Sequence, residues 1–381
     1  MQRFAIEPES QRDEYSPSGG ESNIVFRLPE GLYDFPNMKL SGKIRLAKGA
    51  AGDTAIDEND LTTIDSSIGV EAAIAELSLV SGRGIIQRQA RYNRLARVRA
   101  DVMRSQDSAR AGEFESGRLA TGEPTQGNRL IRNRQDAADS LPFSFSLSSM
   151  GVLQNLFTTE GQDGVQLELR LETDANFFSE RLPVEGSASV ADSKYYLREV
   201  RIEGGFWPMD SLEAGLEKYE NPPFKSYTFV ENILDASRKS VQARISKPIK
   251  AVWAVAQPEA ARGDREYDYL GGKRVPGFES LQIKAAGLES PFTFEIEKPA
   301  NGEDKYLNVV QLAFYRAVSG RTTYGASRLE QEAFSEDRET QGYGARFRSP
   351  VSLQDGPATI TVRSDASAVD KYELFMYLEH E

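Results

Sequence analysis

Short stretches in which apolar and polar residues alternate recur along the chain, and they limit its fold more than any other feature. Residues 141–147 place Leu, Phe, Phe and Leu at every second position, and residues 165–171 alternate Val or Leu with polar residues in the same way. A period of two is that of a strand with one buried and one exposed face. Many such segments with turn residues between them predict an all-β sandwich.

The pattern marks strands in both halves of the chain. We predict strands over residues 23–28, 38–46, 71–80, 141–147, 165–171, 195–202, 224–230, 241–245, 249–255, 281–284, 292–296, 358–363 and 372–378. Each half also carries one predicted helix, over 85–103 and 305–318, followed by a long polar stretch, over 105–140 and 319–347. The halves share this plan without visible sequence identity. We therefore expect two consecutive eight-stranded jelly-roll barrels with short helices and long surface loops.

A chain of 381 residues suits two domains of about 180 residues, each able to bury its own core. The polar residues 1–22, which include Ser, Pro and Gly, are interpreted as a mobile N-terminal arm. The first jelly roll is expected over 23–207 and the second over 208–381.

The charge of the chain bears on its partners. A net charge of −12 argues against a surface built to bind nucleic acid, because phosphate binding depends on clustered Lys and Arg. The predicted helix over 85–103 is nevertheless basic, with Arg88, Arg91, Arg94, Arg97 and Arg99 mostly outside its apolar stripe. It could bind nucleic acid, or it could cover one end of a barrel with its arginines facing solvent or another subunit. The acidity of the whole chain favours the second interpretation, with no sequence-specific nucleic-acid partner.

Several catalytic classes lack the residues that they need. The chain has no cysteine, which excludes disulfides, thiolate nucleophiles and cysteine-based zinc sites. Its one histidine, His380, is interpreted as an exposed residue near the end of the sequence. A Ser-His-Asp triad or a multi-histidine metal site would need a histidine inside the fold.

Other motifs give no site either. The sequence contains no phosphate-binding glycine loop and no zinc-protease or hydrolase signature. Asp53, Asp57, Glu58, Asn59 and Asp60 crowd one loop but lack the spacing of a calcium loop, and residues 262–264 form an Arg-Gly-Asp tripeptide in a polar loop, 257–277. Paired carboxylates for glycoside hydrolysis remain open, since only geometry could select a pair among 58 acidic residues. We predict no catalytic, cofactor-binding or metal-binding residues.

No apolar run approaches the ~20 residues that span a bilayer, and the first residues lack a signal-peptide core. The sequence also contains no Asn-x-Ser/Thr glycosylation site. These features predict synthesis in a cytoplasm.

The order of these segments resembles that of the double jelly-roll major capsid proteins of icosahedral DNA viruses. Residues 141–156, ahead of 165–171, resemble the middle of the first barrel in that family, and 85–101, with the run Arg-Tyr-Asn-Arg-Leu at 91–95, resembles the helix before it. Residues 246–256, 281–291 and 306–318 resemble segments of the second barrel, and 23–28 and 40–46 lie where the first barrel begins.

The resemblance implies a non-enzymatic structural protein of the virion. Three chains would associate so that six barrels form a pseudo-hexameric tile, and the tiles would contact one another, penton and minor capsid proteins and, where the virion has one, an inner membrane. The loops at 105–140, 257–277 and 319–347 would form the exposed crown or clasp neighbouring chains, and the arm at 1–22 would lie at the base.

Two alternatives remain at this stage. One is a carbohydrate-binding or receptor-binding viral β-sandwich, such as a spike or penton protein. The other is a β-sandwich glycosidase, which would need two carboxylates ~5–10 Å apart in a cleft.

Overall fold

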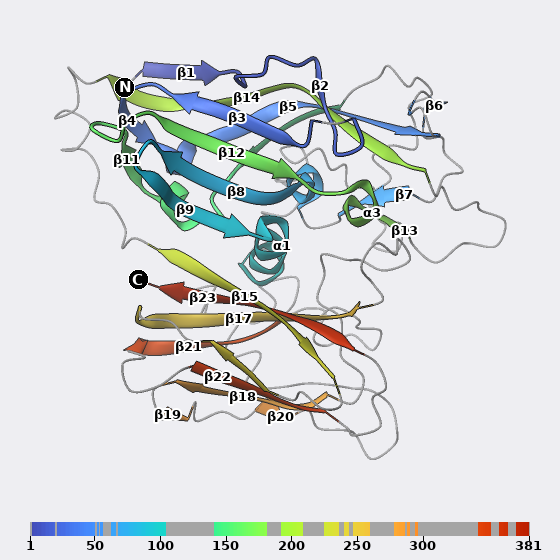
Figure 1. Ribbon diagram of the computed structural model, residues 1–381, viewed down its shortest axis with the longest axis vertical. Helices are drawn as coiled ribbons and strands as arrows, with labels where there is room; N and C mark the ends of the chain where they lie inside the picture. Colours follow the sequence, from blue (N-terminus) through green and yellow to red (C-terminus); the bar gives the residue numbers. More distant parts are fainter. Residues whose placement is uncertain are drawn as a thin grey trace. The chain divides into compact units, whose positions relative to one another are not determined.

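The computed structural model contains two compact units. The structure describes residues 2–19, 21–49, 52, 54–55, 62–65, 68–103, 141–180, 192–208, 225–235, 240–243, 247–259, 278–285, 288–289, 294–295, 342–351, 358–364 and 371–380. The first unit comprises Met1–Arg97, Ala109–Lys225 and Gly263–Leu270, and the second comprises Val98–Ser108, Ser226–Arg262 and Gly271–Glu381. Antiparallel strands form nearly all of the regular structure in both units (Figure 1).

Two sheets build the first unit. The larger contains β1 (Gln2–Ile6), β2 (Glu14–Tyr15), β4 (Gly31–Asp34), β5 (Lys39–Lys48), β6 (Thr54–Ala55), β10 (Leu141–Ser146), β11 (Leu156–Thr158) and β14 (Lys194–Pro208). The smaller contains β3 (Asn23–Leu28), β8 (Ile74–Ser81), β9 (Gly84–Ala90) and β12 (Val165–Leu171). A separate pair joins β7 (Thr62–Ile64) to β13 (Phe178–Glu180). The helical segments are η1 (Phe35–Asn37), η2 (Gly69–Ala73), α1 (Tyr92–Met103), η3 (Gly151–Gln154) and α3 (Asp174–Phe177).

The pairing order of the first unit is that of a jelly roll. Both β4 and β5 pair with β14, and β11 and β10 pair with them in turn, so η1 and η3 each interrupt one long strand. With each interrupted strand counted once, one sheet runs β1-β14-β5-β10 and the other runs β3-β12-β8-β9. In chain order these are strands 1-8-3-6 and 2-7-4-5, the arrangement of an eight-stranded jelly roll.

The second unit repeats this order. One sheet runs β15 (Ser226–Leu234), β23 (Tyr372–His380), β17 (Ile249–Pro258) and β21 (Gly342–Val351). The other contains β16 (Ser240–Ala243), β22 (Ala358–Ser364) and β18 (Phe278–Ala285), and β18 also pairs with β19 (Leu288–Glu289) and β20 (Phe294–Glu295). With β20 as the fifth strand, the sheets are again 1-8-3-6 and 2-7-4-5. The predicted fold class, two consecutive jelly rolls, is confirmed.

Alternating residues build the core of the first unit as the sequence predicts. Along β12 the residues at positions 165, 167, 169 and 171 are buried, while those between them are partly or fully exposed. β3 pairs with β12 in register and buries Ile24, Phe26 and Leu28 on the same side. One-sided burial of this kind fixes the register, because a shift of one residue would turn every apolar side chain to solvent.

The central strands of the second unit are buried on both faces. Every residue of β23 whose exposure is described, from Glu373 to His380, is buried, and so are Ile249 and the run from Ala251 to Val255 in β17. A strand covered on both sides needs no alternation. The nearly continuous apolar sequence of residues 251–256 follows from this burial.

The predicted helix over 85–103 is wrong in its first part. Residues 84–90 form β9, the edge strand of the smaller sheet, and α1 begins only at Tyr92. Between them Arg91 adopts a positive φ of 51°, which ends the strand and turns the chain into the helix. Ile85, placed in the apolar stripe by helical spacing, is instead 62% exposed on the strand.

Residues 1–22 also differ from the mobile arm that the sequence predicts. β1 pairs with β14 from Gln2↔Phe206 to Ile6↔Ile202, as the first strand of the jelly roll. The ring of Phe4 packs edge-on against Tyr33 at 5.2 Å between centroids. Such a short strand gives too few alternating residues for its pattern to stand out.

Several predicted segments lie wholly or mainly outside the described residues. These are the polar stretch 105–140, the helix 305–318, residues 260–277 of the loop 257–277 and residues 319–341 of the stretch 319–347. The last residues of that stretch, 342–347, belong to β21 instead of a loop. The short strands β6 and β7 lie before and after the acidic residues 57–60.

Deletion of residues 1–22 should destabilise the first unit, because it removes β1 and β2 and leaves one edge of β14 unpaired. We expect a loss above ~3 kcal/mol in the free energy of unfolding, the scale of removing one large buried side chain. Phe4→Ala should reproduce part of this loss, and Arg3→Ala, an exposed neighbour on β1, should not. Urea unfolding measures all three, and a truncated chain that unfolds at the urea concentration of the full one would contradict the assignment.

Candidate functional site

The described residues contain no group of three or more His, Cys, Asp or Glu side chains that could hold a metal ion. The acidic residues considered for calcium, Asp53, Asp57, Glu58, Asn59 and Asp60, and the tripeptide at 262–264 lie outside the described residues. Among the helices that are described, none is long and apolar enough to cross a membrane. Hollows and buried charges are the remaining candidates for a site among the described residues.

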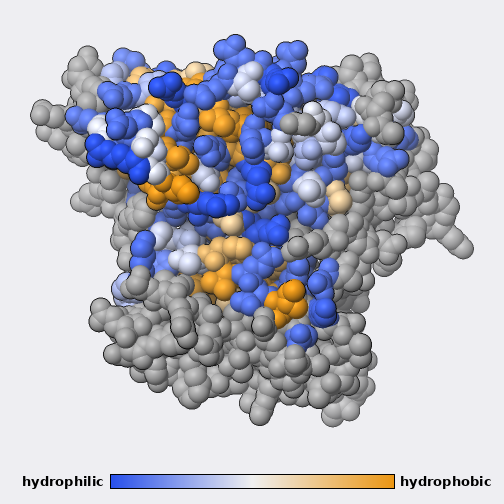
Figure 2. All heavy atoms as spheres, in the orientation of Figure 1, coloured by the Kyte–Doolittle hydropathy of each residue, from blue (hydrophilic) through white to orange (hydrophobic). Residues whose placement is uncertain are grey.

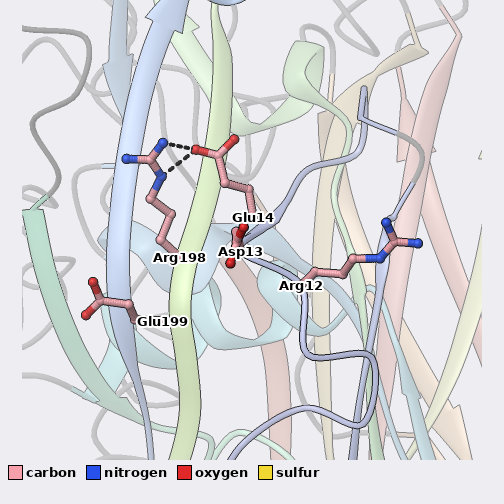
Figure 3. Close-up of a pocket in the computed structure, with 5 residues that line it drawn as sticks. All are labelled: Arg12, Asp13, Glu14, Arg198 and Glu199. Atoms are coloured by element: carbon pink, nitrogen blue, oxygen red, sulfur yellow. Dashed lines mark hydrogen bonds and ion pairs between the residues drawn. The ribbon is translucent and has the colours of Figure 1, made fainter.

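A polar hollow of about 650 Å³ opens beside β2 and β14 and is lined by Arg12, Asp13, Glu14, Arg198 and Glu199 (Figure 3). Glu14 is the carboxylate around which the arginines of this hollow gather. Arg198 points toward it in Figure 3 and forms an ion pair with it. The Nε of Arg45, on the neighbouring strand β5, lies 3.2 Å from Oε1 of Glu14. One carboxylate thus ties β2 to two strands of the larger sheet.

The remaining charges of this hollow are largely occupied as well. Nζ of Lys43 lies 2.6 Å from Oε1 of Glu199, and Nε of Arg12 lies 3.1 Å from Oε2 of Glu21. Glu199 has a positive φ of 48° at a bulge where the register of β14 against β5 shifts. Because both oxygens of Glu14 accept bonds from arginines, the hollow offers no pair of open carboxylates of the kind that a glycosidase requires.

A second concentration of charge lies beneath α1, and the sequence did not predict it. Arg97 forms an ion pair with Asp65 in which both side chains are only 2% exposed. Arg94 is also fully buried. The expectation that the arginines of this helix face solvent or another subunit is therefore wrong for these two, which point into the fold.

Hydrogen bonds continue this network around the start of the helix. The hydroxyl of Tyr92 donates to Oε1 of Glu71 at 2.8 Å, and Nδ2 of Asn93 donates to Oε2 of Glu172 at 3.0 Å and to the carbonyl of Ala72 at 3.1 Å. These contacts fasten α1 to η2 and to the residue that follows β12. Buried charges are tolerated only when they are paired in this way.

Tyr195 completes the network from β14. Its hydroxyl donates to the carbonyl of Glu172 at 2.5 Å. Burial, together with the negative charges of Glu172 and Asp174, raises the pKa of Tyr195 well above its usual value of 10.0. The phenol therefore stays protonated and serves as a hydrogen-bond donor.

In the second unit a buried carboxylate joins three strands. Oε2 of Glu379, on β23, accepts a hydrogen bond from Nε1 of Trp253 on β17 at 3.1 Å. It also accepts one from the hydroxyl of Tyr227 on β15 at 3.4 Å. Trp253 and Glu379 are almost fully buried, so the indole packs in the fold and is not a ligand platform.

His380 is not the exposed residue that the sequence predicts. It is 3% exposed, and its ring nitrogens lie 2.8 Å from the carbonyl of Pro248 and 2.8 Å from Oγ1 of Thr228. Burial lowers its pKa from the usual 6.5. A position near the end of the sequence gave no sign that this residue lies in a central strand.

The buried ion pair beneath α1 should matter far more to stability than an exposed one. Arg97→Met should lower the free energy of unfolding by about 3–5 kcal/mol, because it leaves Asp65 charged and buried. Arg88→Met is the matched control, since Arg88 pairs with Glu76 while its own side chain is 55% exposed, and it should cost less than about 1 kcal/mol. Urea unfolding of both variants tests this, and equal losses would contradict the burial of the network.

No protein-family model matches the sequence, and no curated protein does. Solved structures do match. The Faustovirus major capsid protein superposes with a TM-score of 0.52 and 7% identity over 100% of this chain and 89% of that chain. The PBCV-1 virus capsid gives 0.51 and 10% identity over 99% and 93%, and the Sputnik virophage gives 0.51 and 8% identity over 100% and 85%. At such low identity the likeness is one of fold: this chain has the double jelly-roll fold of the viral major capsid proteins.

Proposed function

We propose that this chain is a major capsid protein that tiles the shell of an icosahedral DNA virus. The observation that carries the proposal is the presence of two consecutive units with one strand order, 1-8-3-6 and 2-7-4-5, along a chain that matches a major capsid protein over 100% of its own length. A single sandwich would suffice for most binding modules. Two similar ones in a row are what a tile with approximate sixfold symmetry needs from three chains.

The proposed assembly is a homotrimer. Three copies of a two-unit chain present six similar sandwiches, so the trimer can occupy a hexagonal position in a shell. Obligate interfaces of this kind bury more surface than transient ones. Neighbouring capsomers, penton proteins, minor capsid proteins and, where there is one, an inner membrane are the further partners, and the virion is the location.

The proposed boundary between the two jelly rolls lies near the end of β14, and the two compact units divide slightly later, between Lys225 and Ser226. We keep the proposed division at 207/208, close to the end of β14 at Pro208. The first jelly roll extends back from residue 23 to β1, because that strand supplies the first position of its pairing order. Residues 1–22 thus belong with the first jelly roll in this proposal.

The described surface suggests how copies would meet. Figure 2 shows hydrophilic residues over much of the visible face, with smaller apolar areas between them. Among the described residues, the only exposed large hydrophobic side chains are Ile85 at 62% and Ile233 at 38%. Contacts made through this surface would contain polar groups and ion pairs, whose attraction is screened by salt.

A non-enzymatic role agrees with the chemistry of the described residues. Two carboxylates of the hollow beside β14, Glu14 and Glu199, are tied to arginines and a lysine, and the buried Glu379 is tied to Trp253 and Tyr227. These contacts stabilise strands. A glycan-binding or glycan-cleaving β-sandwich is the alternative that the experiment must distinguish.

Size-exclusion chromatography with light scattering tests the proposal directly. We expect a stable species near three times the chain mass of 42.3 kDa, and shells or hexagonal tiles in electron micrographs at high concentration. Tile-to-tile association should weaken between about 0.05 M and about 0.5 M salt, where exposed ion pairs are screened. A chain that stays monomeric at every concentration and hydrolyses or binds glycans would contradict the proposal.

A further inference from the structure

His380 joins three segments of the second unit. It is the only histidine among 381 residues and lies at the end of β23, the strand between β15 and β17. Nε2 lies 2.8 Å from Oγ1 of Thr228 on β15, and Nδ1 lies 2.8 Å from the carbonyl oxygen of Pro248, just before β17. With 3% exposure, the ring is almost completely removed from water. Any change in its charge is therefore a change inside the fold.

The hydrogen bond to Pro248 fixes which nitrogen of the neutral ring carries the proton. A carbonyl oxygen can only accept, so Nδ1 must carry a proton and donate it to Pro248. In the neutral ring Nε2 is then an acceptor, and the hydroxyl of Thr228 donates to it. Protonation of Nε2 makes it a donor to Oγ1 of Thr228, so the hydroxyl hydrogen of Thr228 must turn elsewhere. The main cost is the positive charge created in a site that water barely reaches.

The charged groups around the ring only partly offset this penalty. Burial is the largest cause that lowers the pKa of His380 below 6.5, and the positive charge of Lys247 acts in the same direction. The hydrogen bond to Pro248 and the negative charge of Glu379 act in the opposite direction. On β15 the adjacent residues Ser226 and Thr228 carry no charge. On β17 the positively charged Lys250 precedes Ala251, the residue that pairs with Glu379.

We propose that His380 is a pH-sensitive latch: its neutral ring fastens the end of β23 to β15 and to the Lys247-Pro248 turn, and protonation loosens this junction. The neutral ring is bound more favourably in the fold than in the open chain, so the latch is complete above pH 6.5, the value for the open chain. Its contribution falls as the pH drops below that value. This behaviour belongs to the fold of the second unit and does not depend on the proposed role in a shell.

The single histidine makes the direct test simple. In the intact chain one imidazole Cε1–H resonance reports the titration of His380 without interference from other histidines. We expect a midpoint below 6.5. A midpoint at or above that value would overturn the proposal, whatever the assembly state of the chain.

Hydrogen exchange tests whether the titration loosens the junction. Between about pH 7.5 and about pH 5.5, after correction for intrinsic rates, opening of residues 372–380 and 226–234 should rise several-fold, and by at most about tenfold per pH unit from this one group. Residues 165–171 of the first unit are the internal reference and should not follow this change.

Two variants separate the latch from other acid effects. His380→Gln keeps a polar side chain without a titratable ring, and its β23 opening should lose most of the extra pH dependence. Lys247→Gln should shift the imidazole midpoint of the otherwise native chain to higher pH, and it provides the test if His380→Gln fails to fold. Unchanged pH dependence in His380→Gln, or an unmoved midpoint in Lys247→Gln, would contradict the proposed latch.

Discussion

The first unit depends on backbone pairing along β14, its longest strand at 15 residues. One side of β14 bonds to β4 and β5 in succession, and β1 and β2 also pair with it. These partners come from parts of the chain more than 140 residues away in sequence, for example Gln2 opposite Phe206. Burial of β14 therefore requires that strands distant in sequence come together in one register. The bulge at Glu199 adjusts that register so that Leu197 and Ile202 can both be buried.

Buried polar groups then determine the position of α1, which hydrophobic alternation alone does not specify. Apolar packing would tolerate several positions of a short helix over the end of a sandwich. The pairing of Arg97 with Asp65, and of Asn93 with Glu172, is satisfied in one position only, because displacement would leave charges without partners. Glu379 has the corresponding role in the second unit, where it joins three strands through Trp253 and Tyr227.

The strands could be predicted because apolar and polar residues alternate along them. The buried charges could not, because each one pairs with a residue far away in the sequence. Residues 23–28 and 165–171 were predicted with the bounds of β3 and β12, since each has one apolar face and polar neighbours. β9 was mistaken for the start of a helix because Ile85 matches helical spacing although it is exposed. Arg97 was expected to face solvent or another subunit because the helix arginines lie mostly outside its apolar stripe, and its partner Asp65 lies 32 residues earlier, where no local pattern connects them. His380 was missed for the same reason, since Thr228 and Pro248 are more than 130 residues away.

The matched structures agree with this distinction between the strands, which alternation of apolar and polar residues predicts, and the buried charges, which it does not. A fold shared over 100% of the chain at 7% identity means that the path of the backbone is similar while nearly every side chain differs. An active site would demand particular side chains at particular places, whereas a sandwich needs only apolar residues of suitable size on its inner faces. Particular residues become necessary again where charge is buried. For that reason the network beneath α1 and the contacts of His380 depend on particular side chains, whereas the strand order does not.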